Sequence, residues 1–208
     1  MRIYTVSVDE LFKDRDYTFF YPALPNERRK KVDAFLRRED RELCTGAWLV
    51  LKRALADAGI DADSVSFSCG SRGKPRLAAR PDFHFNLSHS GRMVMCAAGG
   101  APVGCDVEKI APVSLELAKR YFYRSEFERI LAEPAGEARN KMFYRLWTLK
   151  ESFMKATGLG FSLALDAFEV GFGEEGIFVR QNVSDKGFSF REIERNDGYC
   201  YAVCRCEG

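Results

Sequence analysis

Two acidic residues, Asp106 and Glu108, lie two positions apart in the segment PVGCDVEKI, residues 102–110. Valine and cysteine alternate with them, and this alternation predicts a buried strand. Because side chains on a strand repeat every two residues, both carboxylates leave the same face. Like charges on one face repel unless a cation lies between them, so the pair predicts a cation site.

A third carboxylate, Glu151, lies in the segment 137–158, whose apolar residues at 142, 146, 149, 153 and 156 have helical spacing. Lys155 follows Glu151 by four positions and shares its helix face. On spacing alone, this pair is more typical of a solvated salt bridge. Together with Asp106 and Glu108, however, Glu151 completes a carboxylate set suited to Mg²⁺, with Mn²⁺ as an alternative ion.

Basic residues match a diphosphate substrate for such an ion. Arg72 and Lys74 lie in the loop SRGKP, and the segment ERRKK occupies residues 27–31. Each is weak evidence by itself, because basic loops and charged helix faces are commonly just solvated.

The chemistry needs elements that bring these residues together. A strand at the N-terminus, a helical segment at 25–59 with a break near residues 39–40, and strands at 64–69 and 83–88 are expected first. The segment 92–108 predicts a β-hairpin that turns at residues 99–102. In that hairpin Met95 faces Asp106 and Met93 faces Glu108, and Ser88 and His89 come within reach of the acids.

The second half repeats this order. Helices are expected at 114–133 and 137–158, followed by strands at 166–172, 176–182, 188–195 and 198–206. Helices followed by antiparallel strands therefore occur twice. We expect an α+β fold with two similar halves, 1–102 and 103–208, each with helices packed on a small antiparallel sheet.

Composition excludes several classes. The chain has 208 residues and a formal net charge of +2, which is too mild to favour nucleic acid as a partner. It shows no signal-peptide pattern and no apolar run of membrane-spanning length, so we expect a cytoplasmic protein without a membrane partner.

The seven cysteines form no C-x-x-C pair. Cys200, Cys204 and Cys206 share a strand face, and a soft-metal or redox role for them stays open beside a packing role.

The segments GKP, FNLSHSG, VGCDVEK, SLELAKRYFYRSEF and RLWTLKESFMKATGLG occur in the order and at about the spacing found in one enzyme family. The chain resembles the 4′-phosphopantetheinyl transferases, and among them the longer, surfactin-synthetase-activating type. The resemblance is strongest from about residue 70 to residue 165. A D-x-E motif alone is common by chance, but its combination with S-H-S and W-x-x-K-E-S-x-x-K is specific.

The resemblance implies transfer of the phosphopantetheine arm of coenzyme A to a serine of an acyl or peptidyl carrier protein, with release of adenosine 3′,5′-bisphosphate. It also implies a pseudo-dimer of the two halves, with the active site at their interface. The metal ligands fall on Asp106, Glu108 and Glu151. The coenzyme A contacts fall on Lys74, Ser88, His89 and Lys155, with Arg72 nearby and with Arg28 and Lys31 near the nucleotide 3′-phosphate. His89 and Lys155 also take part in catalysis, and Glu126 matches an acid often assigned to proton removal.

The expected carrier protein is acidic and binds transiently. An apolar patch for it is expected within the aromatic-rich segment 115–130, which contains Tyr121, Phe122, Tyr123 and Phe127. One chain supplies both halves, so a monomer is expected. A coenzyme A-dependent acyltransferase and a non-enzymatic divalent-ion or nucleotide-binding module are the alternatives, but neither accounts for all three motifs together.

Overall fold

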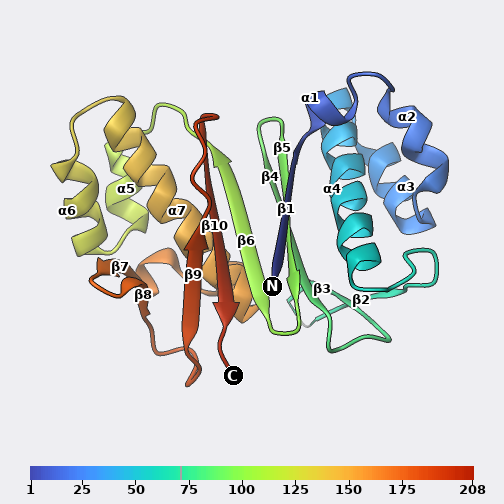
Figure 1. Cartoon of the computed structure of the whole chain (residues 1–208). Coiled ribbons are helices and arrows are strands. Elements are labelled where there is room, and N and C mark those ends of the chain that lie inside the picture. Colours follow the sequence, from blue (N-terminus) through green and yellow to red (C-terminus); the bar gives the residue numbers. More distant parts are fainter. Residues whose placement is uncertain (71) are drawn as a thin grey trace.

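The computed structural model describes residues 1–70 and 72–208, so Ser71 of the predicted SRGKP loop lies outside the described residues. Two groups of helices flank two three-stranded antiparallel sheets (Figure 1). The first sheet has the order β1-β5-β4, and the second has the order β6-β10-β9. The strands are β1 (Arg2–Ser7), β4 (His84–Ser90), β5 (Met93–Gly99), β6 (Val103–Lys109), β9 (Phe188–Glu192) and β10 (Tyr199–Cys206).

Two smaller ribbons complete the strands. Strands β2 (Phe67–Cys69) and β3 (Pro75–Leu77) enclose the loop that carries Arg72 and Lys74, while β7 (Glu169–Gly173) pairs with β8 (Gly176–Arg180).

The helices of the first half are α1 (Val8–Leu11), α2 (Tyr17–Phe20), the 3₁₀ turn η1 (Tyr21–Ala23), α3 (Asn26–Ala34) and α4 (Arg38–Asp57). Helix α4 buries an apolar face that includes Trp48, Leu51 and Leu55 against the first sheet. The predicted break in the long helical segment is present, but it falls between Ala34 and Arg38, slightly before the expected position. The helix ends before Gly59, whose φ of 70° suits glycine.

The helices of the second half are α5 (Leu115–Tyr121), α6 (Arg124–Ala132) and α7 (Glu137–Thr157), followed by the 3₁₀ turns η2 (Gly160–Ser162) and η3 (Leu165–Ala167). The single helix predicted at 114–133 is thus two helices, and the 21-residue α7 matches the predicted one. The α+β fold, with helices and a small antiparallel sheet in each half, is confirmed. The division between residues 102 and 103 stays a prediction.

The hairpin predicted at residues 92–108 is wrong. Strand β5 pairs with β1 on one edge and with β4 on the other, so neither edge is left for β6, which pairs with β10. Met95 consequently lies opposite Ser88 and not opposite Asp106, and Met93 lies opposite Ser90 and not opposite Glu108. The actual hairpin joins β4 to β5 through Gly91, which has a φ of 55°.

The space between the sheets is filled from both sides. Met95 and Ala97 of β5 pack in one buried cluster with Val107 of β6 and Val203 of β10. Cys204 belongs to the core beneath α7. Burial raises the pKa of the Cys200 thiol to about 11.

No described helix is both long enough and apolar enough to cross a lipid bilayer.

Candidate active site

The two sheets meet where β4 lies beside β6. Three alternate side chains of β4 each accept a hydrogen bond from a backbone N–H of β6. The distances are 2.8 Å from Cys105 to Asn86 Oδ1, 3.4 Å from Val107 to Ser88 Oγ and 3.2 Å from Lys109 to Ser90 Oγ. Residue numbers rise together along both strands, so the strands run in parallel. Side chains here take the place of a backbone ladder.

The same serines hold the acidic pair. Ser88 Oγ donates to Asp106 Oδ1 at 2.7 Å, and Ser90 Oγ donates to Glu108 Oε2 at 2.6 Å. The predicted proximity of Ser88 to the acids is therefore confirmed, although it arises from the parallel seam and not from the predicted hairpin. Ser90 was missed as a site residue, and the alternation of Asn86, Ser88 and Ser90 in FNLSHSG was the available signal.

Gly104 lets α7 approach this seam. A methyl group at position 104 would overlap the carbonyl oxygen of Ser152 and the backbone nitrogen of Ala156. Because glycine has no side chain, the helix backbone lies directly against β6. Lys155 Nζ consequently reaches Asp106 Oδ1 at 2.6 Å and Ser88 Oγ at 3.3 Å.

One oxygen of Asp106 is left without a partner. The residue is only 2% exposed, and its Oδ2 is buried with no hydrogen-bond partner among the described residues. Burial raises the pKa of Asp106 more than the Lys155 ammonium lowers it. Buried carboxylate oxygens are rarely unpaired, so this atom marks a place for a ligand.

Glu108 and Glu151 are half-buried, and the negative charge of Asp106 acts on both of them. Burial raises the pKa of both groups, and the charge of Asp106 raises both further. Repulsion of this kind favours a bound cation. As placed in the structure, however, no three His, Cys, Asp or Glu side chains among the described residues are arranged to hold one ion. The three carboxylates lie close enough to repel one another, but they do not surround a common position for an ion.

A cavity of about 660 Å³ opens beside Lys155. Its wall combines the loop after β2 with the end of α7 and includes Arg72, Lys74, Asn86, Lys155 and Gly158. A neighbouring hollow of about 370 Å³ shares Arg72 and Lys74 with it. The structure thus groups three of the predicted basic residues around one cationic recess.

Lys74 has a structural task as well. Its ammonium donates to the backbone oxygens of Val103 at 2.8 Å and of Lys155 at 2.5 Å, which ties the loop to both β6 and α7. Burial lowers the pKa of Lys74 to about 8. A modest rise in pH therefore weakens this positive charge.

The remaining predicted cofactor residues lie at the edges. His89 is exposed on β4, and desolvation together with the nearby Lys155 ammonium lowers its pKa, so the imidazole is neutral at pH 7. Arg28 and Lys31 lie on α3, which packs on α4. Neither residue is among the described side chains that line the cavity next to Lys155.

Glu126 does not fit the predicted role in proton removal. It is 2% exposed and accepts hydrogen bonds from Lys150 Nζ at 2.6 and 2.7 Å, from Val170 N at 2.7 Å and from Tyr123 N at 2.8 Å. Both oxygens are therefore engaged inside the protein. We correct the assignment, because a base must reach the proton that it removes.

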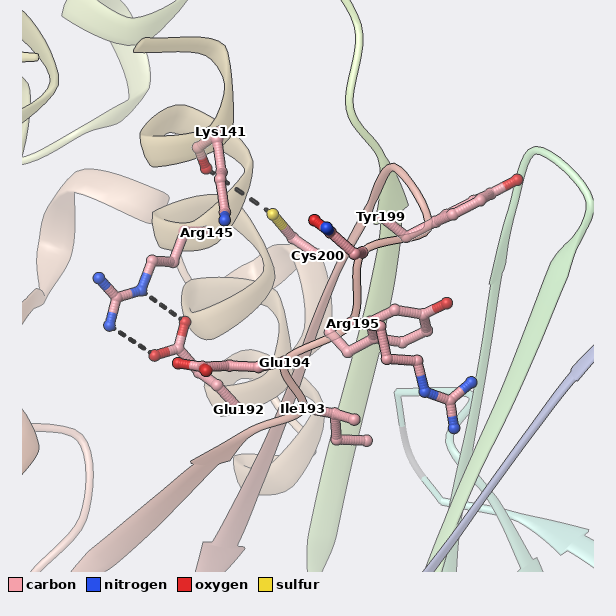
Figure 2. A pocket seen from close by; sticks show the side chains of 10 residues that line it. Lys141, Arg145, Glu192, Ile193, Glu194, Arg195, Tyr199 and Cys200 are labelled. Atoms are coloured by element: carbon pink, nitrogen blue, oxygen red, sulfur yellow. Dashed lines mark hydrogen bonds and ion pairs between the residues drawn. The ribbon is translucent and has the colours of Figure 1, made fainter. Parts of the chain in front are cut away.

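A separate groove of about 460 Å³ lies between α7 and the ends of β9 and β10 (Figure 2). Arg145 spans it to Glu192 with two hydrogen bonds of 2.7 Å. Within the described part of the chain, no predicted site residue lines this groove. The Arg145–Glu192 pair fastens the same helix as Lys155, and Arg145 lies six positions before Glu151.

Two family models match the chain. The model described as the 4′-phosphopantetheinyl transferase superfamily matches residues 102–204, and the model described as 4′-phosphopantetheinyl transferase, N-terminal, matches residues 13–101. The chain is 36% identical to the 4′-phosphopantetheinyl transferase Sfp of Bacillus subtilis, over 98% of this chain and 92% of that protein.

A mammalian protein and a solved structure match less completely. The chain is 31% identical to the L-aminoadipate-semialdehyde dehydrogenase-phosphopantetheinyl transferase of Mus musculus, over 87% of this chain and 66% of that protein. Among solved structures, a holo-(acyl-carrier-protein) synthase from Bacillus anthracis aligns with 51% of this chain and 95% of that chain, with a TM-score of 0.43 and 14% identity.

Proposed function

This chain belongs to the 4′-phosphopantetheinyl transferase superfamily, and we propose that it transfers the phosphopantetheine arm of coenzyme A to a serine of an apo carrier protein. The second product is adenosine 3′,5′-bisphosphate. The observation that carries this proposal is the buried, unpaired Oδ2 of Asp106 at the junction of β4, β6 and α7, beside a cationic cavity.

The donor set fits a hard divalent cation, which we infer to be Mg²⁺, with Mn²⁺ as a substitute. Asp106, Glu108 and Glu151 would hold the ion, and carboxylate oxygens are the ligands that such cations prefer. When bound, it supplies positive charge to the phosphoryl oxygens of the diphosphate. Because no three such side chains of the described residues are arranged to hold one ion, we infer that Glu108 and Glu151 would shift toward Asp106 when the cation binds.

The chain's own residues supply the rest of the charge stabilisation. Lys155, already paired with Asp106, neutralises the leaving phosphate, and Lys74 and Arg72 bind the anionic cofactor in the cavity. Ser88 orients Asp106, so its main contribution is to hold a carboxylate in place. His89 contributes a neutral imidazole hydrogen bond to a phosphate oxygen. Arg28 and Lys31 bind the nucleotide end only if the cofactor extends from the cavity to α3.

An acidic carrier protein fits this mildly basic chain as a transient partner. Leu117 of α5, Tyr123 at the N-cap of α6 and Leu131 of α6 are exposed at 40%, 46% and 39%, whereas Phe122 is buried. We infer that these exposed apolar side chains receive the carrier. We also infer that a cytoplasmic monomer acts alone, because one chain supplies both sides of the site.

Mass spectrometry tests the proposal directly. The purified chain is incubated with coenzyme A, Mg²⁺ and a panel of apo carrier proteins, and the mass of each carrier is followed. We expect the phosphopantetheine mass on at least one carrier, and none on the same carrier after its acceptor serine is changed to alanine. Chelation of the metal should stop the reaction.

The other outcomes identify the alternatives. Transfer of an acyl group without the pantetheine arm, insensitive to a chelator, indicates a coenzyme A-dependent acyltransferase. Binding of coenzyme A with no modified product from any carrier indicates a non-enzymatic binding module and contradicts the proposed activity.

A further inference from the structure

A closed hydrogen-bond network surrounds the fully buried ammonium of Lys150. Its three donors reach Glu126 Oε1 at 2.6 Å, Glu126 Oε2 at 2.7 Å and the carbonyl oxygen of Phe168 at 2.7 Å. Each oxygen of Glu126 accepts one further hydrogen bond, from the backbone of Val170 or of Tyr123. An ammonium has three donors, so the capacity of Lys150 is filled.

The network joins two other elements to α7, the helix that also carries Glu151 and Lys155. Glu126 caps the start of α6, Val170 belongs to β7, and Lys150 belongs to α7. Lys150 directly precedes Glu151 and lies five positions before Lys155. Because consecutive helix residues point about 100° apart, Lys150 anchors α7 on one side while Glu151 faces another.

Stability does not explain this arrangement well. Burial raises the pKa of Glu126 and lowers the pKa of Lys150, so the protein interior opposes the charged form of both groups. Apolar replacements of a buried ion pair are often neutral or stabilising. Directional hydrogen bonds give instead a fixed rotation of the helix, which apolar contacts specify less sharply.

We propose that the buried Glu126–Lys150 pair is a positioning device that sets the rotation of α7 and so aims Glu151 and Lys155 at Asp106. The pair acts from one side of α7, and the close contact with Gly104 of β6 acts on another. Neither Glu126 nor Lys150 touches the reacting atoms. This inference rests on the proposed function for its catalytic readout but not for its binding readout.

The test replaces both charges, so that neither is left unpaired. Glu126→Gln/Lys150→Met is compared with the parent chain for thermal unfolding, for binding of Mn²⁺ alone by electron paramagnetic resonance, and for kcat and KM of transfer. We expect a folded protein with Mn²⁺ binding and kcat each weakened by about tenfold or more, as for residues that orient metal ligands. The KM for coenzyme A should change much less.

The matched control is Arg145→Met/Glu192→Gln, which removes a bidentate pair from the same helix (Figure 2). It should leave Mn²⁺ binding and kcat within about twofold of the parent, because the Arg145 side chain is 36% exposed and an exposed ion pair holds a helix much less firmly than a buried one. A positioning role also predicts that Glu126→Gln and Lys150→Met each lower kcat without changing the shape of its pH profile.

Several results would overturn the proposal. Parent-like Mn²⁺ binding and kcat in the folded double variant would do so, and so would equal losses in the control pair. Loss of a pH-dependent limb in Glu126→Gln alone would restore Glu126 as a base. If the double variant does not fold, Glu126→Leu/Lys150→Met is measured in its place, and failure of both to fold means that the pair serves stability. If the parent transfers nothing, the proposed function fails, while Mn²⁺ binding still decides the positioning role.

Discussion

Two lysine–carboxylate pairs lie five residues apart on α7, and they differ in how completely they are satisfied. In the Lys150–Glu126 pair, both side chains are essentially unexposed and each ammonium donor and each carboxylate oxygen has its partners. In the Lys155–Asp106 pair, the lysine side chain is 26% exposed and Asp106 Oδ2 has no partner among the described residues.

The difference distinguishes a pair that only holds the fold together from a pair that can bind a ligand. A satisfied pair has nothing left to offer a ligand, so it can only hold elements in place. An incomplete pair at the edge of a cavity keeps an acceptor and a charge for something that binds. On sequence pattern alone the two pairs look alike, because each lysine lies in the same K-E-S-x-x-K motif.

The largest expected effect comes from the incomplete pair. Asp106→Asn should lower the transfer rate by about 10²–10³-fold, because the amide removes a negative ligand of the cation that would stabilise the phosphoryl charge. Folding should be retained, since the amide oxygen still accepts from Ser88. Initial rates by mass spectrometry, with the exposed Asp63→Asn as control, measure this. A rate near the parent value would contradict the claim that the Lys155–Asp106 pair, unlike the Lys150–Glu126 pair, takes part in the reaction.

Gly104→Ala tests whether the incomplete pair depends on close packing of α7. The added methyl group collides with helix backbone, so the free energy of unfolding should fall by about 1–3 kcal/mol. Transfer should fall with it as Lys155 moves away from Asp106. Gly100→Ala is the control, because the nearest atom to its added carbon is 3.9 Å away. Denaturant unfolding with equal losses for both variants would contradict the packing explanation.

Ser90→Ala should have a smaller effect. The variant loses the hydroxyl that orients Glu108 and accepts from the Lys109 N–H. Removal of such an orienting group typically costs about tenfold in metal affinity or activity. Titration of activity with Mg²⁺ measures the shift, with Ser64→Ala on the exposed surface as control. An unchanged Mg²⁺ requirement would show that Glu108 needs no orientation from β4.

The smallest expected effect is on stability and depends on pH. Burial, followed by the charge of Asp106, raises the pKa of Glu108, so the folded state binds its proton more tightly than the unfolded state does. The parent therefore loses stability as the pH rises from the unfolded pKa, about 4.3, through the raised folded pKa. In metal-free buffer Glu108→Gln should melt above the parent at pH 7, and this advantage should disappear near pH 4. A lower melting temperature at pH 7 would contradict the repulsion.

Periodicity was sufficient to predict several parts of the site. The strand with Asp106 and Glu108 on one face and the helix with Glu151 and Lys155 follow from the two- and 3.6-residue repeats. Strand pairing did not follow, because the hydrophobic pattern of β5 does not specify which strands occupy its edges. The burial of Glu126 was also out of reach, since its partners Lys150 and Val170 come from distant segments.

The seam between β4 and β6 joins side chains of β4 to backbone N–H groups of β6, in place of a ladder between two backbones. An ordinary ladder is nearly indifferent to mutation, because every residue except proline brings the same donor and acceptor. Here one amide and two hydroxyls make the connection, so single base changes in the gene can loosen it step by step while each sheet keeps its own pairing. The strength of the contact between the two halves can therefore be changed by inherited substitutions at these side chains.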